Sequence, residues 1–217
     1  MTSRRRKRLP DRALDELRAQ YLLKRNDIRN RLDEFERVPE SEYFYELIYC
    51  LLTPQSSAEH AGKVVEALRR DRFRERGFDP EPYLRNRSHY VRFHRVKSKR
   101  LRAARKRSLD TSFLRSDDIA AFRKREFLVR EFTGLGFKEA THFLRNIGRS
   151  ENLAILDRHI LHSLETIAVI DVTPPTLPKK RYLEIEAVFQ EFAERIEIPM
   201  THLDLLFWSM QTGQILK

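Results

Sequence analysis

The sequence predicts an all-α fold, and three observations support this. Apolar residues recur at the spacing of an α-helix along most of the chain. No stretch alternates apolar and polar residues convincingly enough to indicate a strand. Prolines fall between the helical stretches and mark where helices are interrupted. They are Pro39, Pro80, Pro82, Pro174, Pro175 and Pro178.

The helical pattern is clearest in residues 57–69. Apolar side chains fall on one face there, and Ser56 with Glu59 has the spacing of a capping box, which marks a helix start. The same spacing predicts the other helices. In chain order they are 11–36, 41–52, 95–109, 117–132, 138–147, 157–168, 179–195 and 201–212.

At 217 residues the chain suits one domain or two small lobes, and it can bury roughly 70% of its unfolded surface. We expect one helical lobe over residues 41–150. Residues 151–217 should form a second lobe with residues 1–40, whose basic start at Arg4–Arg8 is expected to be disordered. That basic tail either keeps the chain in solution or contacts a polyanion.

The charge balance points to a polyanionic partner. Lys and Arg number 43 against 32 Asp and Glu, a net charge of +11, and nucleic acid is the leading candidate for such a chain. Between Arg95 and Arg107 the sequence holds eight basic residues and no acidic one. This run is either a face that follows phosphates or an ordinary solvated surface.

Several classes of function are not indicated. The single cysteine, Cys50, excludes a disulfide within the chain and cannot hold an iron–sulfur cluster, which takes four thiolates. The seven histidines show no zinc-binding spacing, and neither a phosphate-binding P-loop nor a serine nucleophile motif occurs. We therefore expect no metal and no cofactor. Without a membrane-length apolar run or a signal peptide, the chain is expected to be soluble and cytoplasmic.

A tight turn between two helical stretches is the first candidate for a functional element. Gly134 and Gly136 stand one residue apart in the sequence FTGLGFK, in a chain with only six glycines. Glycines allow a positive φ and expose the backbone, so N–H groups at the start of the next helix can approach a phosphate oxygen. A plain turn between helices would explain the pair equally well.

Lys138 opens the helix after this turn, in a chain with 32 arginines and 11 lysines. A lysine amine can lose its proton and attack a sugar carbon to form a Schiff base, which an arginine cannot do. Taken alone, Lys138 could be an ordinary solvated lysine. Asp157 follows the apolar residues 154–156 at another helix start. Its carboxylate can cap that helix, and it can also stabilise positive charge on a deoxyribose.

The segment from Phe132 to His162 resembles the helix-hairpin-helix DNA glycosylase superfamily. Within that superfamily three features are most similar to the archaeal-type, second class of 8-oxoguanine DNA glycosylase/AP lyases. They are the run KEATHFLRNIG, the segment LLTPQSSA at 51–58, and the ending from the tryptophan to the terminal lysine. The similarity covers about 40–217, and the cluster cysteines of the endonuclease III branch are missing.

The resemblance implies roles for particular residues. Lys138 would be the nucleophile and Asp157 its partner carboxylate, facing it across a cleft between two lobes. Gln55 resembles the segment from which related enzymes insert a side chain into the base stack, although it could be a simple loop residue. The DNA-contacting set would be Gln55, Gly134, Gly136, Arg100 and Arg102. Phe93 could stack on a flipped base or belong to the core.

The last helix and the end of the chain are the candidates for base recognition. Thr201 and Asp204 are expected to cap this helix. Its buried side is expected to consist of Leu203, Leu206, Phe207 and Met210.

Trp208 is either a core residue or a flat surface on which a purine stacks, and Gln211 is the other unusual polar residue of this helix. In the family, the terminal lysine takes part in recognising the oxidised base, which assigns Lys217 that role. An acceptor at N7 or a donor at O8 would distinguish 8-oxoguanine from guanine.

These residues together predict a monomeric enzyme that acts on double-stranded DNA containing an oxidised purine, in the cytoplasm at the nucleoid. Lys138 would displace the base at C1′, and β-elimination would then cut the strand. Two alternatives remain at this point. One is a glycosylase for an oxidised pyrimidine or an alkylated base, and the other is a non-catalytic helix-hairpin-helix module that only binds DNA.

Overall fold

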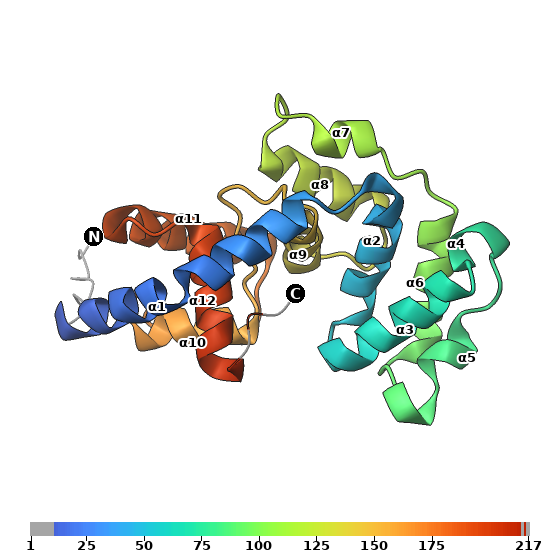
Figure 1. Cartoon of the computed structure of the whole chain (residues 1–217), viewed down its shortest axis with the longest axis horizontal. Coiled ribbons are helices and arrows are strands. Elements are labelled where there is room, and N and C mark those ends of the chain that lie inside the picture. The colour runs from blue at the N-terminus through green and yellow to red at the C-terminus, as the bar shows by residue number, and fades with distance from the viewer. Residues whose placement is uncertain (1–10, 214, 216–217) are drawn as a thin grey trace. The chain divides into compact units, whose positions relative to one another are not determined.

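The computed structural model of the protein describes residues 11–213 and 215 (Figure 1). Every regular element in this part of the chain is a helix, as the periodicity predicts. None of its helices is long and apolar enough to cross a membrane. Arg4–Arg8 and Lys217 lie outside the described residues.

The described chain divides into two compact units. One is Glu36–Arg149, and the other joins residues 11–35 to the described residues from Ser150 onward. The first unit contains, in chain order, η1 (Glu40–Glu42), α2 (Tyr43–Leu52), α3 (Ala58–Arg70), α4 (Phe73–Arg76), α5 (Glu81–Leu84), η2 (Arg87–His89), α6 (His94–Arg105), α7 (Thr111–Arg115), α8 (Ala121–Glu131) and α9 (Phe137–Asn146).

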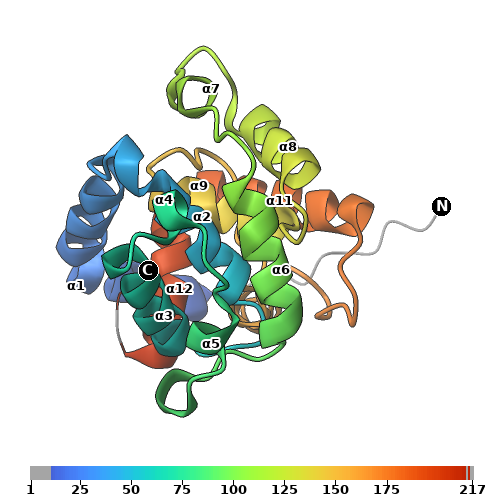
Figure 2. The same ribbon diagram turned by 90° about the vertical axis from the view of Figure 1, so that its right-hand side faces the viewer.

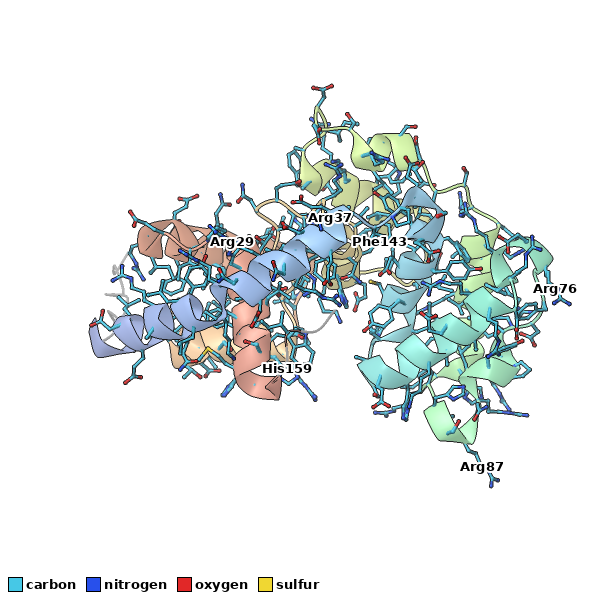
Figure 3. The ribbon with its side chains drawn as sticks, in the orientation of Figure 1. Arg29, Arg37, Arg76, Arg87, Phe143 and His159 are labelled. Atoms are coloured by element: carbon cyan, nitrogen blue, oxygen red, sulfur yellow. The ribbon has the colours of Figure 1, made fainter. Side chains whose placement is uncertain are left out.

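Helix α2 forms the centre of the first unit. All ten of its residues are buried, because α3, α6 and α9 pack against it (Figure 2). A helix with apolar residues on every side is stable only when it is enclosed in this way, and the one charged residue of α2, Glu46, accepts a hydrogen bond from Asn146 of α9 over 3.1 Å. Helix α8 packs on α9, and Phe143 of α9 is fully buried, whereas Arg76 and Arg87 extend into solvent (Figure 3).

The second unit contains α1 (Asp11–Glu36) up to Phe35, together with α10 (Arg158–Thr166), α11 (Lys179–Ile196) and α12 (Met200–Thr212). Helix α12 packs against both α10 and α11. Two hydrogen bonds join it to α1. Tyr21 Oη lies 2.9 Å from His202 Nδ1, and Lys24 Nζ donates to Ser209 Oγ over 3.0 Å.

Two expected helix caps are wrong in their position. Ser57, in extended conformation, caps α3 and accepts the His60 N–H over 3.3 Å, so Ser56 is not the cap. Helix α12 begins at Met200 with Pro199 at the N-cap and no side-chain cap, so Thr201 lies inside the helix.

Other expectations need smaller corrections. Met210 is 50% exposed, so it does not belong to the buried side of α12. The helix expected at 117–132 starts only at Ala121, and a separate short helix, α7, precedes it.

Candidate active site

The hairpin between α8 and α9 needs a glycine at its first glycine position. Gly134 has φ of +100°, and a Cβ there would lie 2.5 Å from Cδ of Arg100. The structure therefore brings two of the predicted DNA-contacting residues together. The arginine of α6 lies directly against the backbone of the hairpin.

Gly136 is not required by its backbone conformation. Its φ of −89° and ψ of −176° are accessible to any residue. Its N–H, however, donates to Oε2 of Glu139 over 3.1 Å, and a Cβ on Gly136 would lie 2.9 Å from that oxygen. The missing side chain leaves room for the carboxylate that closes the start of α9.

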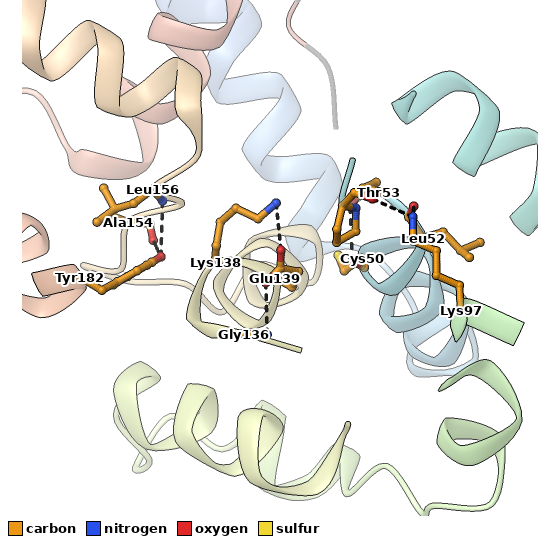
Figure 4. A network of polar contacts seen from close by, with 11 residues as sticks. Cys50, Leu52, Thr53, Lys97, Gly136, Lys138, Glu139, Ala154, Leu156 and Tyr182 are labelled. Atoms are coloured by element: carbon orange, nitrogen blue, oxygen red, sulfur yellow. Dashed lines mark hydrogen bonds and ion pairs between the residues drawn. The ribbon is translucent and has the colours of Figure 1, made fainter. Parts of the chain in front are cut away.

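Lys138 is the second residue of α9, and its side chain is 27% exposed. Its Nζ lies 3.1 Å from Oε1 of Glu139 (Figure 4). One carboxylate thus holds both the hairpin N–H and the amine. The amine must leave this ion pair and lose its proton before it can act as a nucleophile.

Sequence reasoning missed Glu139. A signal was present, because a glutamate three residues after a helix cap is one half of a capping box. The glycine at position 136 concealed it, since the other half of that motif is normally Ser or Thr.

The two other residues predicted to contact DNA in this unit, Gln55 and Phe93, share an uncommon backbone. Gln55 has φ of 55° and Phe93 has φ of 59°, and both side chains are exposed, so Phe93 is not a core residue. The two turns are joined, because the N–H of Arg92 donates to Oγ of Ser56 over 3.0 Å.

The basic run of 95–107 is not a uniform surface. Arg102 is exposed, as a phosphate contact requires. Arg105 packs back on the fold and donates to the carbonyl oxygens of Arg74 and Glu75. Lys97 is only 2% exposed, so it belongs to neither of the two surfaces expected for this run, a phosphate-following face or a solvated one. Its burial, with the positive charge of Arg100 nearby, lowers the pKa of the Lys97 ammonium to about 8.

In the second unit, Asp157 caps α10, as its position in the sequence predicts. The N–H groups of His159 and Ile160 both donate to Oδ1 of Asp157, each over 2.8 Å. Because both bonds use the same oxygen, Oδ2 takes no part in the cap. One carboxylate can therefore close the helix and still present an oxygen for chemistry.

The segment before Asp157 is held in place by α11. The N–H of Ala154 donates to Glu186 over 2.8 Å, and the hydroxyl of Tyr182 donates to the carbonyl oxygen of Ala154 over 2.5 Å (Figure 4). Ala154, Ile155 and Leu156 are themselves buried. The aspartate is thus fixed from both sides, by the buried segment and by the helix it caps.

Trp208 and Gln211 come together on His159. The indole of Trp208 stacks on the His159 ring, with centroids 5.0 Å apart and planes 18° from parallel. Gln211 contacts His159 Nδ1 through Oε1, and its Nε2 donates to the carbonyl oxygen of His159 over 3.0 Å and to Ser163 over 2.9 Å. Nothing in the sequence singles out His159, because its importance follows only from its contacts with Trp208 and Gln211 of α12.

No group of three or more His, Cys, Asp or Glu side chains in the described part of the chain could hold a metal ion. The reactive groups that the described residues do offer are an amine on α9 and a carboxylate that caps α10.

Comparisons with known proteins agree with this arrangement. A family model described as 8-oxoguanine DNA glycosylase (Ogg-HhH) matches residues 28–198. The 8-oxoguanine DNA glycosylase/AP lyase of Fusobacterium nucleatum is 39% identical over 198 residues, which are 87% of this chain and 90% of that protein.

Two solved structures are also similar. One is the Methanocaldococcus jannaschii 8-oxoguanine glycosylase/lyase in complex with a 15mer DNA containing 8-oxoguanine. It gives a TM-score of 0.79 at 34% identity and covers 93% of this chain and 99% of that one. The 8-oxoguanine DNA glycosylase of Thermotoga maritima gives a TM-score of 0.83 at 31% identity, over 95% and 99% of the two chains. The helical hairpin, the lysine behind it and the aspartate cap thus stand in a chain that belongs to the helix-hairpin-helix family of 8-oxoguanine DNA glycosylases.

Proposed function

We propose that this protein removes 8-oxoguanine from double-stranded DNA and then cuts the strand at the resulting abasic site. The observation that carries the proposal is the placement of Lys138, a partly exposed amine directly behind the hairpin. The relatives named 8-oxoguanine DNA glycosylase/AP lyase support the choice of lesion. The partner is therefore DNA, on which one chain acts as a monomer at the nucleoid.

The chemistry needs only groups that the chain itself supplies. The deprotonated amine of Lys138 attacks C1′ as the bond to the base breaks, and the base leaves with the bonding electrons and takes up a proton. The attacking nitrogen loses a proton, and its lone pair then forms the C=N bond of a protonated imine as the ring oxygen leaves C1′ with the bonding electrons and takes up a proton. Loss of a proton from C2′ expels the 3′ phosphate by β-elimination. Asp157 stabilises the positive charge that develops on the sugar and accepts or returns protons.

The residues around Lys138 have roles in binding the DNA under this proposal. The hairpin with Gly134 and Gly136, together with Arg100 and Arg102, holds the phosphates in a sequence-independent way. Gln55 fills the space that the extruded base leaves. Phe93 stacks on the flipped base.

Base recognition is assigned to the end of the chain. Trp208 offers its indole to the flipped purine, and Gln211 keeps the His159 ring against that indole. Lys217 supplies the groups that read the oxidised base, either an acceptor at N7 or a donor at O8.

A panel of duplexes that differ in one nucleotide tests this function. The duplexes carry 8-oxoguanine, guanine, an oxidised pyrimidine, an alkylated purine or a preformed abasic site. We expect release of the base and strand cleavage with 8-oxoguanine, cleavage at the abasic site, and no excision of guanine. Excision of the pyrimidine or of the alkylated purine in preference to 8-oxoguanine would overturn the assigned lesion, and binding without any cleavage would leave only a DNA-binding module.

Binding to undamaged duplex is expected to weaken steeply as salt rises. Each neutralised phosphate releases counterions, and a protein that contacts six to ten phosphates loses about 10³–10⁵ in affinity between 50 and 200 mM salt. Replacing Arg100 and Arg102 together should make the plot of log affinity against log salt shallower. It should also lower the affinity for lesion DNA and for undamaged DNA by the same factor. If the affinity of the wild type does not change with salt, the proposed phosphate contacts are contradicted. If the double variant loses affinity for lesion DNA alone, the two arginines belong to the base pocket.

Deletion of Lys217 is expected to impair excision of 8-oxoguanine far more than cleavage at a preformed abasic site. The reason is that abasic DNA offers no base to recognise, so only the first reaction depends on the end of the chain. Gel assays on the two substrates measure the ratio directly, and extension of the chain beyond Lys217 should give the same pattern. Equal losses on both substrates would show that the terminus supports the fold and does not read the base.

A further inference from the structure

Lys97 lies buried at the end of helix α2, where its ammonium contacts one oxygen atom of the helix and two of the loop that follows. Its Nζ donates to the carbonyl oxygen of Leu52 over 2.6 Å (Figure 4). It also donates to the carbonyl oxygen of Pro54 over 2.7 Å and to Oγ of Ser56 over 3.0 Å. Leu52 is the last residue of α2. The acceptors therefore follow one another along the end of α2 and the loop after it.

The number and kind of these contacts explain why a charged side chain is buried here. An ammonium has three N–H donors, and each of the three finds an acceptor. The last carbonyl groups of a helix lack partners within the helix and carry the negative end of its dipole, so a cation is stabilised at this point. A methionine or leucine of similar length would fill the space and leave these oxygens without their donor.

The loop that Lys97 holds has an unfavourable backbone. Residues 53–56 form a turn closed by the N–H of Ser56, which donates to the carbonyl oxygen of Thr53 over 3.0 Å. Pro54 and Gln55 are its central residues, and Gln55 takes φ of 55°, where glycine or asparagine is usual. A side chain in this region persists only when its surroundings fix it.

The contact extends to the second exposed residue of this surface. Ser56 Oγ, which accepts from Lys97, also accepts the N–H of Arg92, and the next residue, Phe93, has φ of 59°. Phe93 is the N-cap residue of α6, and its carbonyl oxygen accepts the backbone N–H of Lys97 over 2.9 Å. One lysine thus joins the two turns whose outer side chains, Gln55 and Phe93, are exposed.

We propose that Lys97 is a positioning residue that holds Gln55 and Phe93 in the conformation in which they contact the DNA. This inference rests on the proposed function and adds a residue to it. The energy of extruding a base must be offset by side chains that fill the gap at once, and a loop that is already ordered loses no entropy when it does so. Lys97 itself does not touch the DNA, because it is buried.

Base extrusion without chemistry tests the proposal. The Lys138→Gln background stops the reaction, and 2-aminopurine beside the 8-oxoguanine becomes fluorescent when its neighbour leaves the stack. In this background we expect Lys97→Met to lower the fluorescence gain at saturating protein about fivefold or more. Affinity for undamaged duplex should stay within about threefold, because a buried lysine contacts no phosphate. The matched control is Lys63→Met, an exposed lysine on α3 paired with Glu59, which should leave the fluorescence gain unchanged.

A double-mutant cycle separates positioning from a general structural role. If Lys97 acts through Gln55, then Lys97→Met should lower the fluorescence gain much less in a Gln55→Ala protein than in one that keeps Gln55. Ser56→Ala is the milder variant, should Lys97→Met fold poorly. It removes one acceptor and the link to Arg92, and it should give a smaller loss in the same direction at unchanged far-UV circular dichroism.

Two outcomes would overturn the inference. One is a Lys97→Met or Ser56→Ala protein with an undiminished fluorescence gain, and the other is a loss that is fully additive with Gln55→Ala. Failure of the proposed function looks different, because the protein with Lys97, Ser56 and Lys138 all intact would then neither extrude nor excise 8-oxoguanine.

Discussion

Replacing Lys138 by glutamine is expected to abolish both base excision and strand cleavage, because the side-chain amide cannot form an imine. The rate of product formation should fall to the background rate of the duplex alone. Affinity for lesion DNA should remain within about tenfold, since one contact among many phosphates is lost. Single-turnover gel assays and a filter-binding or anisotropy titration measure the two quantities on the same duplex.

The control for this substitution is Lys180→Gln. Lys180 is an exposed lysine of α11, and the same chemical change there should leave the rate unaltered. Retention of full cleavage by Lys138→Gln would assign the imine to another amine. A parallel loss of DNA affinity by several orders of magnitude would instead make Lys138 chiefly a binding residue.

Replacing Asp157 by asparagine is expected to slow base excision about 10²-fold or more, because a neutral amide cannot stabilise the positive sugar. The cap should survive, since asparagine and aspartate are nearly equivalent at the start of a helix. The melting temperature should therefore change little while the rate falls. Single-turnover excision and thermal unfolding of the same preparation test both halves of this expectation.

Two further variants separate the roles of this carboxylate. Asp157→Ala removes the acceptor of the His159 and Ile160 N–H groups. It should lower the free energy of unfolding by about 1 kcal/mol and also slow base excision. Asp110→Asn is the matched control, because Asp110 caps α7 and accepts the N–H of Phe113 over 2.9 Å. It should alter neither quantity. A lower melting temperature at an unchanged rate for Asp157→Asn would reduce Asp157 to a helix cap.

The features that the sequence predicts well are local ones. The long helices follow from the spacing of apolar residues, and the Asp157 cap follows from an acceptor placed just before a helical stretch. The short helices α4, α5 and α7 were not predicted. They have four or five residues, which is too few for a helical period to show.

The contacts that the sequence could not reveal join distant segments. In the sequence Lys97 is one of several basic residues of the same helix. Only its hydrogen bonds to the carbonyl oxygens of Leu52 and Pro54 distinguish it. His159 gains its place from Trp208 and Gln211, which belong to another helix. Spacing along one segment carries no information about such partners, so these two residues emerge only from the fold.

The most direct test of the central claim is borohydride trapping on a duplex that contains 8-oxoguanine. Borohydride reduces an imine between enzyme and sugar to a stable covalent bond, and the adduct can be digested and its attachment site determined by mass spectrometry. The proposed chemistry predicts a protein–DNA adduct with 8-oxoguanine but not with guanine, attached at Lys138 and absent from Lys138→Gln. Base release and strand cleavage without any trapped adduct, or an adduct at another lysine, would contradict it.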